Sequence, residues 1–227
     1  MKLSVIIPVY NEQATLIDML ERVKRVPISK EVIVINDGST DRTKKILRRY
    51  RRQKDFKILT FLKNQGKGAA VRKGIDEARG DYLVIQDADL EYNPVDWHAL
   101  LQLAKRGATV VYGSRFQGAY VVRWHNMLHF FANRMLTALT NLLYGSHLTD
   151  METAYKLIKR TVAQSLVLKS SRFEIEPEIT AKIFKKGIKI YEVPISYAGR
   201  QYHEGKKIGW RDGVTSLWAI VYYRFFN

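Results

Sequence analysis

Cysteine is absent from this 227-residue chain, and Asp and Glu number 22 against 38 Lys and Arg. The lack of cysteine excludes a disulfide framework and thiolate-bound zinc, and it is compatible with a reducing compartment. No uncharged apolar run approaches the roughly 18 residues that a membrane-spanning helix needs, so we expect no transmembrane segment. The apolar start over residues 1–9 is interrupted by Pro8 and is too short for a signal sequence. These absences predict a cytoplasmic location.

The excess of basic residues gives a formal net charge of +16. Such a charge predicts a polyanionic partner, which can be nucleic acid, an anionic membrane surface or a phosphorylated small molecule. The densest basic run, over 44–52, has helical spacing, and we interpret it as a solvated helix face. Because no nucleic-acid-binding signature accompanies this run, we expect no nucleic acid partner.

Short β-rich segments alternate with longer amphipathic segments through the first half of the chain. We predict strands over residues 3–9, 31–35, 57–62, 82–86 and 109–112. We predict helices over residues 14–25, 42–52, 67–78 and 95–105. This alternation indicates an α/β fold, a mostly parallel sheet flanked by helices in a single domain over 1–227. Its binding crevice is expected at the carboxyl ends of the strands.

The second half of the chain changes character. We predict helices over 124–144, 160–169, 176–186 and 210–226, and a strand over 188–193. The apolar side chains of 124–144 suit either the core or contact with lipid, whereas Trp97 is expected in the core. The polar, basic loop over 199–207 has glycines near both ends and is expected to close over an anion.

The most informative segment is Asp87-Ala88-Asp89, which follows the apolar run over 82–85 and precedes Leu90-Glu91. In an extended segment, alternation would place Asp87, Asp89 and Glu91 on one side. Three hard oxygen ligands suit Mg²⁺ or Mn²⁺, which can stabilise the negative charge of a departing phosphate. The alternative interpretation is a solvated acidic turn that caps the next helix.

Polar segments also follow the other predicted strands. They lie at 10–12, 36–39 and 113–115, and they are expected to converge at one edge of the sheet. The loop over 64–68 contains two glycines near a helix N-terminus, which suits either a phosphate or a tight turn. His125 and His129 have the spacing of a helical metal pair, but without a third ligand we interpret them as packed or surface residues.

The ordered motifs VIIPVYNE (5–12), NDGSTD (36–41), NQGKG (64–68) and DAD (87–89) resemble the family 2 glycosyltransferases with the GT-A fold. Downstream segments narrow the resemblance to the dolichyl-phosphate mannosyltransferase-like, or polyprenyl-phosphate glycosyltransferase, branch. These segments are GSR (113–115), LTDMET (148–153), EPEIT (176–180) and the loop over 199–207. The resemblance implies a Rossmann-like domain whose half over 1–115 binds a nucleotide-sugar. The half over 116–227 would bind the acceptor close to a membrane.

The resemblance also implies roles for individual residues. Nucleotide binding is expected from Pro8, Tyr10, Glu12, Asp37, Lys67, Asp87 and Ala88. Asp87, Asp89 and Glu91 are expected to hold Mg²⁺ or Mn²⁺, although the family often has Gln at the position of Glu91. The residues expected to act in catalysis are Asp89, Arg115, Arg200 and Lys206. The acceptor phosphate is expected to contact Arg123, Arg134 and Lys207, since arginine makes charge-assisted, bidentate contacts with phosphate.

The implied activity is metal-dependent transfer of a sugar, with inversion, from GDP-mannose or UDP-glucose to a polyprenyl or dolichyl phosphate. A phosphate acceptor needs no base, because its second pKa is about 6. A hydroxyl of a glycan or lipid is the alternative acceptor, and it would require a base such as Asp150, Glu174 or Glu176. A third alternative is a non-catalytic basic module that binds nucleic acid or an anionic membrane.

A lipid acceptor implies peripheral contact with the cytoplasmic face of a membrane. We expect this contact to involve 124–144, 210–226 or both, because their aromatic and Leu-rich faces adjoin basic residues. A membrane protein that recruits the chain is the alternative.

Overall fold

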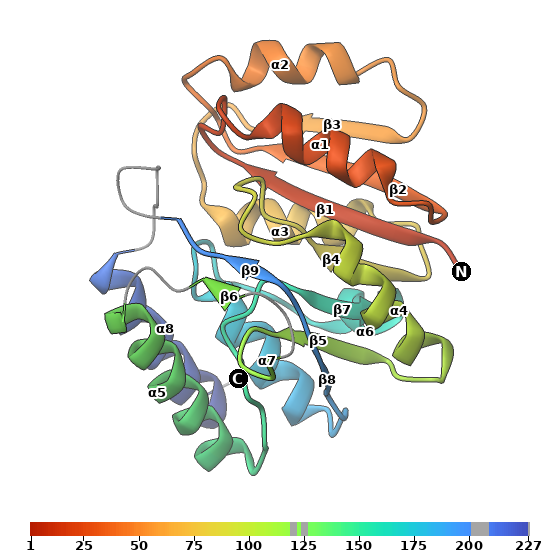
Figure 1. Cartoon of the computed structure of the whole chain (residues 1–227). Helices are drawn as coiled ribbons and strands as arrows, with labels where there is room; N and C mark the ends of the chain where they lie inside the picture. Colours follow the sequence, from red (N-terminus) through yellow and green to blue (C-terminus); the bar gives the residue numbers. More distant parts are fainter. Residues whose placement is uncertain (119–121, 124–126, 201–208, 227) are drawn as a thin grey trace.

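A computed structural model describes residues 1–118, 122–123, 127–200 and 209–226 of the chain (Figure 1). The main sheet consists of β1 (Leu3–Val9), β2 (Lys30–Asn36), β3 (Phe56–Thr60), β4 (Tyr82–Ile85), β5 (Val110–Ser114), β7 (Lys156–Lys159) and β8 (Tyr191–Pro194). A separate two-stranded sheet pairs β6 (Val122–Arg123) with β9 (Tyr197–Ala198). The helices are α1 (Leu16–Arg25), α2 (Thr43–Tyr50), α3 (Lys67–Glu77), η1 (Pro94–Asp96), α4 (Trp97–Lys105), α5 (Met127–Tyr144), α6 (Arg160–Ser165), α7 (Ile175–Lys185) and α8 (Trp210–Phe225).

The predicted α/β class with a mostly parallel sheet is confirmed. Within the described residues the strand order is β3-β2-β1-β4-β7-β5-β8, and β7 runs antiparallel to both of its neighbours. The other neighbouring strands of this sheet pair in parallel. The parallel strands β1, β2 and β4 therefore end at the same edge, where the polar motifs follow them.

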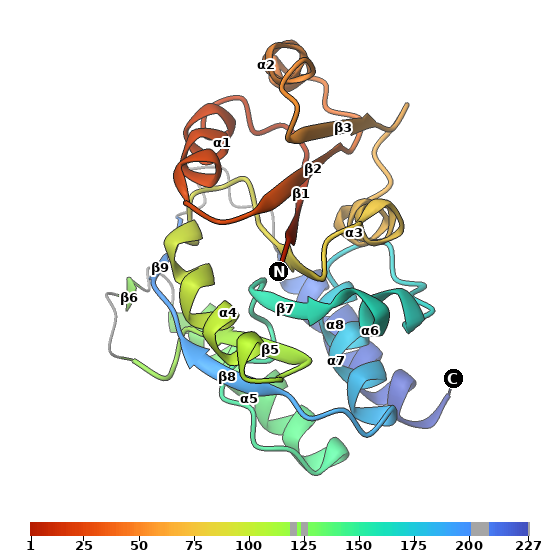
Figure 2. The same cartoon turned by 90° about the vertical axis from the view of Figure 1, so that its right-hand side faces the viewer.

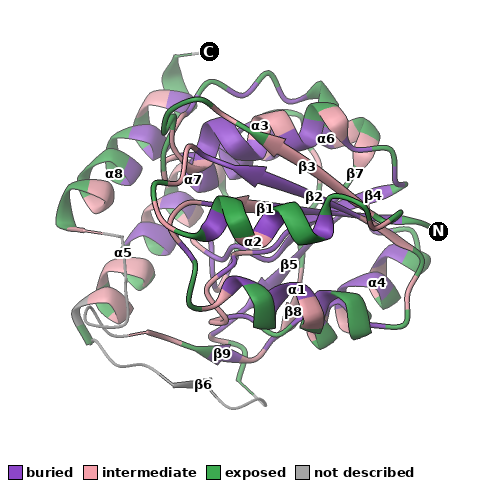
Figure 3. Ribbon diagram, turned by 90° about the horizontal axis from the view of Figure 1, so that it is seen from above, coloured by how far each residue is buried: buried purple, intermediate pink, exposed green. Residues whose placement is uncertain are grey.

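Two apolar layers cover the sheet because side chains alternate along each strand. On β1, Val5 and Ile7 join the buried cluster beneath α1, α2 and α4, whereas Ile6 joins the cluster beneath α3, α6 and α7. Figure 2 shows these two sets of helices on opposite faces, and Figure 3 shows the buried strands between them. Trp97 is fully buried in the first cluster, as predicted.

Helices α5 and α8 lie side by side and form a further layer outside α7 (Figure 1). Tyr144 on α5 donates a hydrogen bond to the carbonyl of Ile220 on α8 (2.9 Å). The basic residues Lys44, Lys45, Arg48 and Arg49 are exposed on α2, which confirms their interpretation as a solvated helix face, and Arg51 and Arg52 are exposed just after the helix. Among the described residues, no helix is both long enough and apolar enough to cross a membrane.

Several predicted elements in the second half differ from the structure. The strand β7 was not predicted, the helix expected over 160–169 ends at Ser165, and the strand expected over 188–193 occupies Tyr191–Pro194. β7 comprises only Lys156–Lys159, which is too short for a clear periodic pattern. Its pairing with β4 and β5 is a long-range contact that the local sequence does not predict. Most of the loop predicted to close over an anion, including Lys206 and Lys207, lies outside the described residues.

Candidate active site

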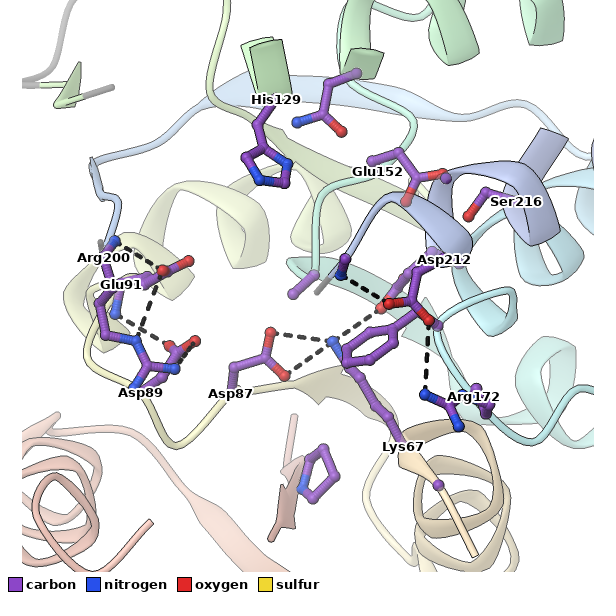
Figure 4. A pocket seen from close by; sticks show the side chains of 18 of the residues that line it. Lys67, Asp87, Asp89, Glu91, His129, Glu152, Arg172, Arg200, Asp212 and Ser216 are labelled. Atoms are coloured by element: carbon purple, nitrogen blue, oxygen red, sulfur yellow. Dashed lines mark hydrogen bonds and ion pairs between the residues drawn. The ribbon is translucent and has the colours of Figure 1, made fainter. Parts of the chain in front are cut away.

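A cavity of about 630 Å³ lies at the carboxyl ends of β1, β2 and β4 and extends between α5 and α8 (Figure 4). All seven residues predicted to bind the nucleotide line it, as do Asp89, Glu91, Arg115 and Arg200. The convergence predicted from the ends of the strands is therefore present in the structure. The cavity also takes in residues from the second half of the chain, from α5 and α8 among others.

Asp37 organises the loop that follows β3. Its carboxylate accepts hydrogen bonds from the backbone amides of Gln65 (2.7 Å) and Gly66 (2.8 Å) and from Nδ2 of Asn64 (2.8 Å). The Asp37 side chain thus holds one wall of the cavity in place. Its expected role in nucleotide binding stays a prediction.

Gly66 allows this loop to pack against the segment before α7. Its φ of 97° lies in the region that favours glycine, and a Cβ atom here would lie 2.2 Å from the carbonyl oxygen of Ser171. Ala69 donates a backbone hydrogen bond to the same oxygen (3.1 Å). Residues 64–66 thus pack closely against the backbone of the segment before α7, and they position Lys67 at the start of α3.

Lys67 joins the two halves of the site through a chain of alternating charges (Figure 4). Its ammonium lies 2.9 Å from Asp87 and 3.2 Å from Glu176, and Glu176 in turn lies 2.6 Å from Lys156. Burial lowers the pKa of Lys67, but Asp87 and Glu176 outweigh burial and raise it above its ordinary value. Burial raises the pKa of Glu176, and Lys156 and Lys67 outweigh it and lower that pKa. Lys67 and Glu176 are therefore both charged at neutral pH.

Arg200 lies among three carboxylates on the other side of the cavity. Its guanidinium lies 3.0 Å from Asp89, 3.4 Å from Glu12 and 3.7 Å from Glu91, while its backbone amide donates to Glu91 (2.8 Å). Burial and the carboxylates of Glu91 and Asp87 raise the pKa of Asp89 to about 8, against the lowering effect of Arg200. The acidic charge here exceeds what one arginine neutralises.

The predicted placement of three carboxylates on one side of an extended segment is wrong. β4 ends at Ile85, and Leu90 has a φ of 65°, so the segment turns instead of alternating. As a result Asp87 faces Lys67, while Asp89 and Glu91 face Arg200 (Figure 4). Within the part of the chain that the structure describes, no three His, Asp or Glu residues form a cluster that could hold a metal ion.

Arg115, expected to act in catalysis, and the two arginines expected to bind the acceptor phosphate have different surroundings. Arg115 lines the cavity, but its Nε and Nη2 donate to the two oxygens of the fully buried Asp150, each at 2.7 Å. Arg134, on α5, is exposed and lies over the ring of Phe116, 5.4 Å from its centre. Arg123 is placed only by its backbone, in β6.

The three carboxylates considered as bases all have partners. Asp150 binds Arg115, Glu176 binds Lys67 and Lys156, and Glu174 accepts the backbone amides of Ser171 and Arg172 (3.1 Å each). Sequence analysis gave no role to Glu152, which belongs to the LTDMET segment (148–153) and lines the cavity. His129, set aside as a packed or surface residue, also lines the cavity.

The helices at the far end of the cavity carry exposed apolar side chains. On α5 these include Met127, Phe131 and Met135, and on α8 they include Trp210 and Trp218. Met135 and Trp210 also line the cavity. The apolar surface is therefore continuous with the site.

Comparison with known proteins assigns the chain to a family. The sequence profile of glycosyl transferase family 2 matches residues 4–167. The chain belongs to this family. It is 30% identical over 219 residues to a dolichol-phosphate mannosyltransferase of Pyrococcus furiosus, covering 92% of this chain and 60% of the relative. It is 28% identical over 211 residues to an undecaprenyl-phosphate 4-deoxy-4-formamido-L-arabinose transferase of Photorhabdus laumondii. This match covers 90% of this chain and 62% of the relative. The chain thus spans about three fifths of the length of these family 2 relatives.

This chain also has the same fold as solved glycosyltransferase structures. The glucosyl-3-phosphoglycerate synthase of Mycobacterium tuberculosis, crystallised with Mn²⁺, uridine diphosphate and phosphoglyceric acid, superposes with a TM-score of 0.74. The match covers 100% of this chain and 79% of that one, at 18% identity. The GT-A fold predicted from the motifs is confirmed.

Proposed function

We propose that this chain is an inverting glycosyltransferase that moves a sugar from a nucleotide-sugar, GDP-mannose or UDP-glucose, to the phosphate of a polyprenyl lipid. The observation that carries the proposal is one cavity lined both by the nucleotide-binding motifs and by two helices with exposed apolar side chains. Such a cavity suits a polar donor at one end and a lipid-like acceptor at the other. The names of the Pyrococcus and Photorhabdus relatives support the same acceptor class.

In the proposed step, an acceptor phosphate oxygen attacks the anomeric carbon and forms a new C–O bond. The bond from that carbon to the donor diphosphate breaks, its electron pair leaves with the nucleoside diphosphate, and the configuration inverts. No proton has to be removed, because the acceptor phosphate is already ionised. This chemistry agrees with a site in which Asp150, Glu174 and Glu176 all have partners. Arg200, released from its carboxylates, would supply positive charge to the phosphates.

A divalent cation fits the chemistry of the acidic groups around Arg200. Asp89 and Glu91 offer the hard oxygen donors that Mg²⁺ and Mn²⁺ prefer. Burial, together with the carboxylates of Glu91 and Asp87, raises the pKa of Asp89, so a bound cation would favour its ionised form. Arg200 occupies the position of a cation among these donors. We propose that Asp89 and Glu91 hold the metal and that Asp87 stays with Lys67. Bound metal would stabilise negative charge on the leaving diphosphate.

An acceptor comparison tests the proposed function. With Mn²⁺ and either radiolabelled UDP-glucose or GDP-mannose, we expect transfer to a short polyprenyl phosphate and none to the matching polyprenol. The polyprenol is the matched control, because it has the same chain and lacks only the phosphate. Transfer to the polyprenol or to a glycan hydroxyl at a similar rate would instead favour the alternative acceptor class.

We further propose that the apolar faces of α5 and α8 contact an anionic membrane surface. Trp218 is 59% exposed and Phe225 is 65% exposed on α8, and Arg211 and Arg224 lie on the same helix. Replacing both Trp218 and Phe225 by Ser is expected to weaken liposome binding about tenfold or more, because burying one large apolar side chain contributes about 1.5–3 kcal/mol. Flotation with vesicles containing anionic lipid measures the effect, and wild-type binding should weaken with salt.

The control for flotation is Leu62→Ser, which removes an exposed apolar side chain from the loop after β3. This variant should float like the wild type. Equal flotation of the α8 variant and the wild type would move the contact elsewhere. No binding at any lipid composition would favour a membrane protein that recruits the chain.

A further inference from the structure

Glu152 is a carboxylate that lines the cavity and has no hydrogen-bond or ion-pair partner among the residues that the structure describes. It lies between α5 and β7, and its Oε1 atom is buried without a hydrogen bond. Within the described residues, no ion pair or hydrogen bond reaches either of its oxygens. Figure 4 shows Glu152 on the side of the cavity opposite Asp87, where His129 and Ser216 also line the space. A buried polar group in this state is costly, so a ligand that satisfies it is expected.

The cations near Glu152 are already bound to other carboxylates. Lys156 donates to Glu176 (2.6 Å) and to the carbonyl of Thr153, and Arg115 binds Asp150 (2.7 Å). Burial raises the pKa of Glu152 to about 7, with Lys156 and Arg115 lowering it and Glu176 and Asp150 raising it. The surroundings therefore leave Glu152 to be satisfied from the cavity side.

The chemistry of the proposed substrates decides which group lies there. The ionised Glu152 carboxylate repels phosphate, which disfavours the donor diphosphate and the acceptor phosphate as its ligand, and the polyprenyl chain has no hydrogen-bond donor. The donors that remain are on the base, the ribose and the transferred sugar. The base and ribose are expected where β1 and β2 end, beside Pro8 and Asp37, which line the other end of the cavity. Only the sugar hydroxyls remain.

We propose that Glu152 binds a hydroxyl group of the transferred sugar and thereby contributes to the choice of donor sugar. This inference rests on the proposed function, because it takes a nucleotide-sugar as the donor. The hydroxyl donates to the buried Oε1, which supplies the missing hydrogen bond. Because the contact involves only the sugar, Glu152 should affect binding of the nucleotide-sugar and leave binding of the nucleoside diphosphate unchanged.

The test compares two ligands that differ by the sugar alone. Calorimetry with Mn²⁺ measures the affinities for UDP and UDP-glucose, and for GDP and GDP-mannose, in the absence of acceptor. We expect Glu152→Ala to weaken binding of the nucleotide-sugar about tenfold to a hundredfold, the range for a hydrogen bond to a charged group. Glu152→Gln keeps an acceptor oxygen and should show a smaller loss. Both variants should bind the nucleoside diphosphate as the wild type does.

Two controls separate this role from a structural one. Glu77→Gln removes the same charge from a carboxylate paired with Lys57 and Lys73 outside the cavity, and it should change neither affinity. Because the folded-state pKa of Glu152 is raised, its ionisation costs stability as pH rises from its unfolded value towards about 7. Glu152→Gln should therefore not lower the thermal midpoint at neutral pH. If Glu152 had a structural role instead, its replacement would lower the thermal midpoint and would also weaken binding of the nucleoside diphosphate.

The possible failures can be distinguished. If the wild type binds a nucleotide-sugar and Glu152→Ala binds it equally well, the assignment of Glu152 is overturned and the proposed function stands. If Glu152→Ala weakens binding of the nucleoside diphosphate as much as binding of the nucleotide-sugar, the assignment is also overturned. If the wild type binds no nucleoside diphosphate, the proposed donor class is wrong and the assignment of Glu152 falls with it.

Discussion

Asp89→Asn is expected to lower the rate of sugar transfer by about a hundredfold to a thousandfold, since a metal ion stabilises transition-state charge by several kcal/mol. Asp89 lies beside Glu91 and pairs with Arg200 at 3.0 Å, so it is central to the proposed cation site. The amide of Asn lacks the charge that holds a divalent ion against the diphosphate. Calorimetry should show that the variant loses the Mn²⁺-dependent part of nucleoside diphosphate binding.

The fold of Asp89→Asn should remain intact. The pKa of Asp89 is raised to about 8 in the folded chain, so the stability that its protonated form contributes is lost as pH rises towards that value. Removing this carboxyl should therefore not lower the thermal midpoint at pH 7. The control, Asp81→Asn, neutralises an exposed carboxylate just before β4 and should keep full activity. Unchanged transfer by Asp89→Asn, or full wild-type activity in EDTA, would falsify the metal assignment.

The location of the site could be predicted from sequence because it depends on local order. Polar residues follow apolar strands, and parallel strands bring their carboxyl ends to one edge whatever the details of packing. Asp37, Asp87 and Glu12 therefore line one cavity although up to 75 residues separate them. The alternation of strands and helices likewise predicted the mostly parallel sheet.

The partners of these side chains could not be predicted, because they come from distant parts of the chain. Asp87 pairs with Lys67 instead of facing the same way as Asp89 and Glu91. Lys67 also pairs with Glu176, which is 89 residues beyond Asp87 in the sequence. The positive φ of Leu90 turns a segment that periodicity alone would extend. The sequence Leu90-Glu91 contains no glycine or asparagine that would have predicted a positive φ at this position.

Glu152 was missed for a related reason. Its neighbours Met151 and Thr153 are fully buried, and the LTDMET segment that contains them does not indicate that Glu152 alone of the three lines the cavity. What distinguishes Glu152 is the absence of a partner within the described structure, and this becomes visible only when Lys156 and Arg115 are seen bound to other carboxylates. The sequence shows which residues carry ionisable side chains, but only the fold shows which of them have no protein partner and can bind a ligand.

Asp150→Ala is expected to lower the free energy of unfolding by about 3–5 kcal/mol, because it leaves a buried charge without its partner. Asp150 is fully buried and accepts three hydrogen bonds from Arg115, from the backbone amide (3.0 Å), Nε (2.7 Å) and Nη2 (2.7 Å). Urea denaturation at neutral pH measures the loss. The control is Lys57→Met, which breaks the partly exposed pair with Glu77 and should cost less than about 1 kcal/mol.

A double variant separates the loss of the ion pair from the loss of packing. Replacing Asp150 by Leu and Arg115 by Met removes both charges and keeps much of the apolar volume, so most of the lost stability should return. The pair would then be expected to serve the site by fixing Arg115 at the cavity wall, where it lies beside Tyr197, 5.1 Å from the ring centre. The double variant should therefore be stable and transfer sugar poorly. A loss below about 1 kcal/mol in Asp150→Ala would show that the pair contributes little to folding and that Arg115 readily finds another anion.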